Sequence, residues 1–287
     1  MRRFPHLLAS VVVAAACASR TAPMATPKPA SPAAPAVAAA PAPLRYSNGT
    51  NRYRLESQTH VVQEVMGQSQ AVDVSTAVLV TVAVADAAAG NLGVGITIDS
   101  LAINLPAGAP GADPAALATA RGKTTKLVAS PQGQIVSVTP PDSVAPAIQQ
   151  VAQGFREFLP QLPAAAPEAG ATWTDSTTTT TPSSIGTATL HMARLHKVVG
   201  WEDHGGTRAL HLTTTTTYTI SGSGEAQGQS IELSGGGVRN ADAFISAAGV
   251  YLEGSTSDSS LVNANVITAG MVVPVHSTTH STLTRLP

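Results

Sequence analysis

The sequence predicts an α+β fold dominated by strands: long, curved antiparallel sheet or sheets in two β-rich halves, with one amphipathic helix at about residues 142–159 packed on the sheet. Three observations predict it. Residues 72–84 carry β-branched side chains at every second position, the period of a half-buried strand. Residues 140–163 interrupt this alternation with helical spacing. The second of two runs of five threonines, 177–181 and 213–217, continues an apolar alternation on both of its sides.

The first 17 residues predict a lipoprotein export signal. Two arginines precede an apolar stretch, residues 4–16, that is too short to span a bilayer as a helix. The segment "AAAC" ending at Cys17 is similar to a lipobox, in which the cysteine becomes the lipidated first residue of the mature protein; ordinary cleavage after Ala18 is the alternative. Cys17 is the only cysteine, so the chain forms no internal disulfide. We expect an exported outer-membrane lipoprotein, facing the periplasm or the cell surface and anchored to the membrane at Cys17.

Residues 18–43 predict a disordered spacer between this anchor and the folded part. They are almost entirely Ala, Pro, Ser and Thr, and they offer too little apolar surface to fold. Prolines favour an extended chain of about 3.1 Å per residue, so the spacer reaches at most roughly 80 Å. The folded part is then residues 44–287, with a first β half at 44–139, a helical segment at 140–163 and a second β half at 170–287.

Composition argues against nucleic-acid binding. Only 11% of the residues are charged, 3% are aromatic, and the formal net charge is -1. Binding to a nucleic acid requires clustered Lys and Arg together with aromatic side chains that stack on bases. We therefore expect no nucleic-acid partner.

The first half begins with a long hairpin. Apolar side chains occupy odd positions between Tyr53 and Val65 and even positions from Val72 onward. Pairing Val65 with Val72 places both sets on one face and leaves Gln68-Ser69 as a two-residue turn. A third strand is expected at 92–103, followed by a shorter hairpin in which "KTTKLVA" and "QIVSV" flank the turn "SPQGQ".

The predicted helix has an apolar stripe and defined ends. Asp142 or Ser143 can cap its first turn, and Pro160 stops it. The stripe consists of Val144, Ile148, Val151, Phe155 and Phe158 or Leu159. It needs an apolar surface to bury against, and the inner face of the sheet supplies one.

The second half predicts further strands. The threonine runs are read as strands because the branched Cβ of Thr suits a pleated surface. Other strands are expected at about 187–199, 228–238, 243–254 and 260–285, with Gly/Ser-rich turns or bulges at 221–224 and 234–237. In the last strand, His276 and His280 share the face opposite Val273, so they are expected to face solvent.

No sequence motif indicates catalysis or cofactor binding. The chain contains neither G-x-S-x-G nor S-x-x-K, and its glycines do not open a helix as a phosphate loop would. We expect no cofactor and no metal. An envelope hydrolase with an unrecognised Ser-His site is the alternative hypothesis.

Several segments together resemble an uncharacterised family of bacterial lipoproteins that is known only as a domain of unknown function. These segments are "LRYSNGTNRYRLESQTHVVQEVMGQ", "GKTTKLVASPQGQIVSVTP", the helix ending "FLPQLP", and "PEAGATWTDSTTTT". Their order carries the match, which covers roughly residues 44–220, and the family offers no catalytic residues. The architecture is also similar to that of the lipoprotein-carrier half-barrels, in which a curved antiparallel sheet and a helix enclose an apolar cavity.

The functional prediction is an extracytoplasmic lipoprotein, non-catalytic, that binds an apolar ligand or a protein partner or serves a structural role in the envelope. One short helix cannot cover the whole apolar side of a long sheet, so a ligand face remains unless the second half closes over it. The residues expected on that face are Val72, Val74, Val78, Val80 and Val82.

Overall fold

The computed structural model describes residues 42–65, 67–105, 117–142, 146–183, 186–226 and 228–287. The expected export signal, the lipidated Cys17, the spacer up to residue 41 and the expected capping residue Ser143 lie outside these residues. Within the described ranges, no helix has both the length and the apolar character that a membrane crossing requires.

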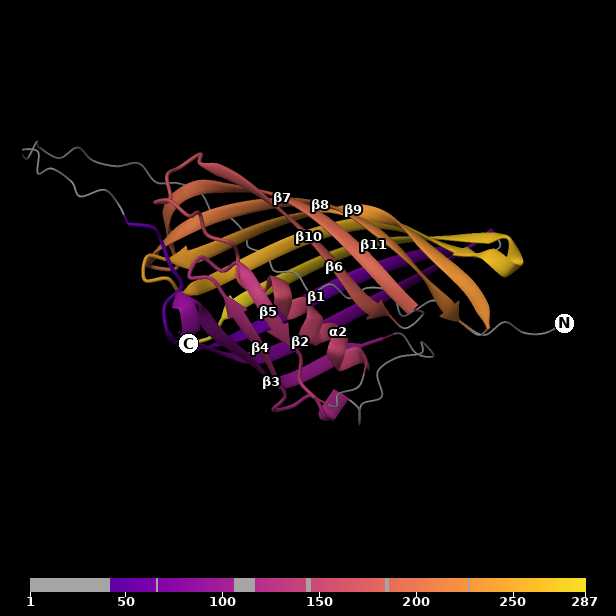
Figure 1. The fold of residues 1–287 in the computed structure, drawn as a ribbon, viewed down its shortest axis with the longest axis horizontal. Helices are drawn as coiled ribbons and strands as arrows, with labels where there is room; N and C mark the ends of the chain where they lie inside the picture. Colours follow the sequence, from indigo (N-terminus) through magenta and orange to yellow (C-terminus); the bar gives the residue numbers. More distant parts are fainter. Residues whose placement is uncertain (1–41, 66, 106–116, 143–145, 184–185, 227) are drawn as a thin grey trace, which may run out of the picture.

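The fold is one antiparallel sheet of eleven strands with a helix against it (Figure 1). The strand order is β5-β4-β3-β2-β1-β11-β10-β9-β8-β7-β6. The strands are β1 Gly49–Val65, β2 Gln68–Asp86, β3 Leu92–Asn104, β4 Thr124–Ala129, β5 Ile135–Thr139, β6 Thr172–Ser183, β7 Gly186–His204, β8 Thr207–Ala226, β9 Gln229–Ser246, β10 Tyr251–Val266 and β11 Met271–Arg285. The predicted β-dominated antiparallel fold is confirmed.

A single strand pair joins the N-terminal and C-terminal strands into one sheet. Strands β1 to β5 follow one another outward on one side, and β11 to β6 follow one another on the other side. The joint is the β1–β11 pair, in which Tyr53 lies opposite Arg285 and Gln63 lies opposite Val275. The two ends of the sheet, β5 and β6, are consecutive strands in the sequence, and the helical segment lies between them in the chain.

The first hairpin has the predicted face but not the predicted turn. Val65 pairs with Gln68 rather than with Val72, so the turn falls between Val65 and Gln68. Gly67 has φ 77°, a left-handed conformation that glycine adopts without steric cost. Because both registers pair odd with even positions, Val61 still lies opposite Val72 and the two apolar sets share one face.

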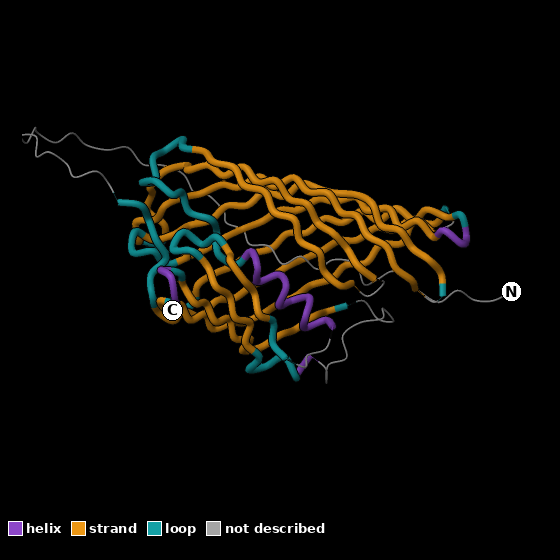
Figure 2. The backbone as a smooth tube through the Cα atoms, viewed as in Figure 1, coloured by secondary structure: helices purple, strands orange, loops and turns teal. Residues whose placement is uncertain are grey.

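The predicted helix is present but shorter than expected. It comprises α2, Pro146–Gly154, and a 3₁₀ turn η2, Phe155–Glu157, in place of one helix over 142–159. Val144 of the predicted stripe lies outside the described residues, and the rest of the stripe is buried, with Ile148 at 0% and Phe155 at 1% exposure. These side chains join residues of β1 to β4 and β7 to β11 in one core, and the sheet curls around the helix (Figure 2). We call the face of the sheet toward α2 the inner face and the opposite one the outer face.

Both threonine runs lie within strands, as predicted, but other strand ends differ from the prediction. The expected strand 260–285 is broken by the turn η3, Ile267–Ala269, where Gly270 has φ 59°. The expected turn or bulge at 234–237 instead lies inside β9, where the strand pairing is regular. A Cβ on Gly236 would collide with the backbone of Tyr218, so the glycines there permit close strand approach rather than a change of direction.

Candidate functional site

The inner face carries three bands that run across the strands: apolar, polar, and apolar again. On β9 the inward side chains change from Ile231 and Leu233, through Arg239, to Ile245. On β11 they change from Val273 and Val275, through Ser277, Thr279 and Ser281, to Leu283. The order on β1, β8 and β10 is the same. The pairing register therefore places residues of the same kind side by side on adjacent strands, which makes each band continuous across the sheet.

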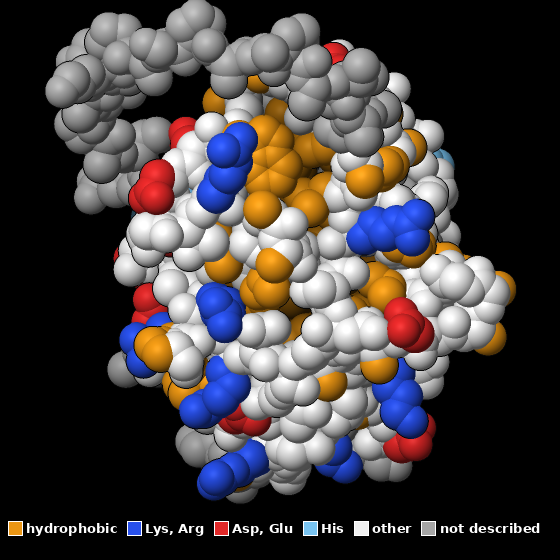
Figure 3. Space-filling view, turned by 90° about the vertical axis from the view of Figure 1, so that its left-hand side faces the viewer, with side chains coloured by type: hydrophobic (Ala, Val, Ile, Leu, Met, Phe, Trp, Pro, Cys, Tyr) orange, Lys and Arg blue, Asp and Glu red, His pale blue; other side chains and the backbone are white. Residues whose placement is uncertain are grey.

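The first apolar cluster lies under α2. Phe158 packs edge-on against Tyr53 at 5.4 Å and Tyr251 at 6.0 Å between ring centroids. Viewed from this end of the molecule, apolar side chains gather at the centre and charged ones surround them (Figure 3). Three of the five valines expected to face a ligand belong to this cluster: Val78, Val80 and Val82 are at most 3% exposed. They are packed against the helical segment and form part of the core.

The second apolar cluster lies at the opposite end of the inner face and consists of strand residues alone. Its members come from β8, β9, β10, β11 and β1, and all are aliphatic or methionine. The buried ones are Ile231, Leu233, Val262, Ala264, Val266, Val273 and Val275, and the partly buried ones are Val61, Val65, Ile220 and Met271. The other two predicted ligand-face residues, Val72 and Val74, are half-buried toward this end of β2. Among the described residues, no part of α2 belongs to this cluster.

The polar belt between the clusters is built around Glu157, the last residue of η2. Its carboxylate accepts a hydrogen bond from Arg194 Nη2 of β7 at 2.6 Å and another from Arg239 Nη1 of β9. Arg239 also donates through Nε to Asp258 of β10 at 2.9 Å. Asp258 accepts a further bond from Tyr218 Oη at 2.7 Å. The belt thus binds the end of the helical segment to strands β7, β9 and β10.

Buried charges set the protonation of the belt. Burial alone would raise the pKa of Glu157, but the charges of Arg239 and Arg194 and their hydrogen bonds lower it below its usual value. Burial opposes ionisation of Asp175 as well, and hydrogen bonds from His196 and Arg194 lower its pKa. The carboxylates therefore stay ionised as partners of the arginines at neutral pH.

His196 connects three strands within the belt. Its Nε2 lies 2.7 Å from Asp175 Oδ2 of β6, and its Nδ1 lies 2.9 Å from Thr214 Oγ1 of β8. Burial lowers its pKa, and the hydrogen bond to Asp175 opposes this only in part. The order hydroxyl, imidazole, carboxylate matches a nucleophile relay. However, His196 is only 4% exposed and Trp173 stacks on it at 5.0 Å, so the side chains bind one another rather than a substrate.

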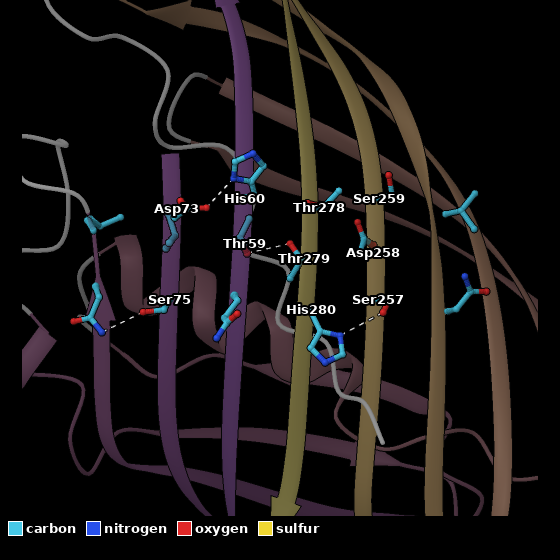
Figure 4. Close-up of a pocket in the computed structure, with 16 residues that line it drawn as sticks. Thr59, His60, Asp73, Ser75, Ser257, Asp258, Ser259, Thr278, Thr279 and His280 are labelled. Atoms are coloured by element: carbon cyan, nitrogen blue, oxygen red, sulfur yellow. Dashed lines mark hydrogen bonds and ion pairs between the residues drawn. The ribbon is translucent and has the colours of Figure 1, made fainter. Parts of the chain in front are cut away.

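The outer face carries a separate, polar groove of about 880 Å³ over strands β2, β1, β11, β10 and β9 (Figure 4). Most of its lining residues, among them His60 and Asp73, lie on the outer face, and Thr59, Asp258 and Thr279 of the inner face border it as well. His60 Nδ1 pairs with Asp73 Oδ1 at 2.7 Å, and Ser257 Oγ lies 3.4 Å from His280 Nδ1. His276 and His280 are both exposed, as predicted. In the described part of the chain, no three His, Cys, Asp or Glu side chains are placed to hold a metal ion.

No protein-family model matches this chain, and no curated protein matches it.

The belt residues were not predicted from the sequence, although a signal was present. Arg194 and His196 share the inward parity of Met192 and Val198, and Arg239 shares the parity of Leu233. In a chain with few charges, ionisable side chains at inward positions indicate a buried network. Their partner Glu157 is not identifiable in this way, because its position depends on how the helix packs.

Proposed function

We propose that this chain is an exported, lipid-anchored binding protein without catalytic activity, and that the second apolar cluster binds the acyl chain of a lipid. The observation that carries the proposal is a cluster of buried aliphatic side chains that spans five neighbouring strands and, within the described ranges, contains no helix residue. At about 4.8 Å between strands, five strands span roughly 20 Å. An elongated aliphatic chain matches this cluster in length and in apolar character.

The polar belt supports a ligand that has both an aliphatic and a polar part. It borders the second cluster on one side, with Tyr218 and Ser260 in the row of side chains between that cluster and Arg239. Ligand sites are largely apolar with a few polar groups that fix orientation. The outer groove is the less suitable candidate for such a ligand, because only three of its sixteen lining residues, Val74, Leu105 and Val238, are aliphatic.

The anchor and the location are part of the same proposal. Lipidation at Cys17 would tether the protein, and the spacer of residues 18–43 would keep the folded part within reach of membrane lipids. This arrangement suits a protein that binds acyl chains close to the membrane in which it is held.

Uptake of a fluorescent fatty acid tests the proposal, using full-length chain with Cys17→Ser so that no anchor lipid interferes. We expect uptake, and we expect co-purified lipid in native mass spectrometry. Val61→Gln, which puts a polar group into the second cluster, should abolish uptake. Val238→Gln is the matched control, because Val238 is 45% exposed on the outer face of β9. A bare mass without uptake would contradict acyl binding and leave a protein partner or a structural role.

A further inference from the structure

The two ends of the sheet are protected to very different degrees. Strand β5 has only five residues and is followed directly by Pro140 and Pro141, so it offers little backbone for pairing. Strand β6 has twelve residues and pairs with β7 alone among the described strands. A long, unpaired edge of this kind is a template for a further strand.

The exposed part of β6 lacks the features that usually block edge pairing. Ser176, Thr177, Thr178 and Thr180 are exposed, and the segment 176–181 contains no charged residue and no proline; the proline of β6, Pro182, is the last residue but one of the strand. The nearest ionisable side chain, Asp175, points to the inner face, where it is bound by Arg194 and His196. β-branched threonine also has a high preference for strands.

From this edge we infer that the protein forms a twofold dimer in which β6 pairs antiparallel with β6 of a second copy. The strand is self-complementary. When the twofold axis passes through Thr177, Ser176 of one copy lies opposite Thr178 of the other, and Asp175 lies opposite Thr179. When the axis passes through Thr178, Ser176 lies opposite Thr180 of the other copy. In neither register does a charge meet its own copy, which is what an isologous interface requires.

Hydrogen-bonded threonine pairs of the kind that this interface would contain already occur between strands of the sheet. Three directly opposed threonine pairs are hydrogen-bonded through their hydroxyls: Thr59 with Thr279 at 3.0 Å, Thr97 with Thr124 at 2.8 Å, and Thr180 with Thr189 at 3.1 Å. Opposed Thr pairs on adjacent strands stabilise a sheet. A β6–β6 pair would repeat this chemistry across the twofold axis, and it does not depend on the proposed lipid site.

Light scattering and sedimentation of the full chain with Cys17→Ser test this inference, and a dimer is expected. The double change Ser176→Lys and Thr178→Lys places two lysines opposite one another in either register: positions 176 and 178 meet when the axis lies at Thr177, and position 178 meets its own copy when the axis lies at Thr178. It should raise the dimer dissociation constant at least about tenfold. Thr217→Lys with Thr219→Lys is the control, because these exposed threonines lie on β8 inside the sheet. The control variant should remain dimeric.

Crosslinking locates the contact. With Cys17→Ser as background, Thr178→Cys should be joined to its copy by a short bifunctional maleimide, whereas Thr217→Cys should not. A monomeric parent would overturn the inference, and so would a dimer that the lysine substitutions at positions 176 and 178 leave unchanged. Capture of a foreign strand by a monomeric parent would show that the edge serves another partner, and would overturn the dimer as well.

Discussion

The two apolar clusters of the inner face lie on the same strands but differ in what packs over them. The first contains aromatic residues and the buried stripe of α2 and η2, whereas the second contains aliphatic strand residues and one methionine. The helical segment ends at Glu157, where the polar belt begins. The alternation of a strand thus determines which of its side chains face inward, but not what packs against them.

The largest expected effect is a difference in the free energy of unfolding between substitutions in the two clusters. Phe155→Ala removes a ring that is 1% exposed between helix and sheet, and should lower the free energy of unfolding by about 3–5 kcal/mol. Leu233→Ala in the second cluster should lower it by about 2 kcal/mol at most, because no described helix residue packs on this cluster and its strands can relax more easily into the space left. Urea unfolding measures both. Equal losses would show that the second cluster is an ordinary core.

A second effect of similar size is expected when a charge of the polar belt between the two clusters is removed. Arg239→Met leaves the buried carboxylate of Asp258 without its ion-pair partner and should cost about 3 kcal/mol in unfolding experiments. Arg52→Met is the control. Arg52 pairs with Asp99 at 3.4 Å, but its side chain is 56% exposed, so the loss should stay below about 1 kcal/mol. A similar loss in both variants would contradict a structural role for the belt.

The smallest effect is a pH dependence that originates in the belt alone. The folded-state pKa values of His196, Glu157 and Asp175 all lie below their ordinary values. As pH falls, the unfolded chain therefore binds protons before the folded one, and stability decreases. The histidine contribution is lost below about pH 6.5 and the carboxylate contributions below about pH 4.5.

Urea unfolding between pH 8 and pH 4 measures this dependence. His196→Gln should flatten the part of the profile near pH 6.5, and a substitution of exposed His276 should not change it. An unaltered profile in His196→Gln would show that His196 does not contribute.

The sequence predicted strands and faces well because both are local properties. The parity of Val61 and Val72, the threonine strands and the outward His276 and His280 follow from a period of two, and the structure confirms them. Turn positions are predicted less accurately: the predicted hairpin turn lies two residues beyond the observed one, and a turn or bulge is predicted where β9 continues without interruption. In that strand the glycines respond to close contact with Tyr218, a tertiary effect that no local pattern contains.

The candidate site was predicted only in part for the same reason. Val72 to Val82 were recognised as one apolar face, but the position of α2 decides which of these valines are core, and the belt that limits the helix was not foreseen. Pairings such as Arg239 with Glu157 join residues 82 positions apart. Such pairs depend on the packing of helix against sheet rather than on any segment of the sequence.

The β1–β11 pair also brings the two ends of the folded chain together. Tyr53 lies opposite Arg285, and Leu286 N donates to Arg52 O at 2.8 Å. A short linker from residue 287 to residue 44 would therefore make the fold circular. New ends between Val65 and Gln68 would leave every strand pair of the sheet in place, so the protein is a natural candidate for circular permutation.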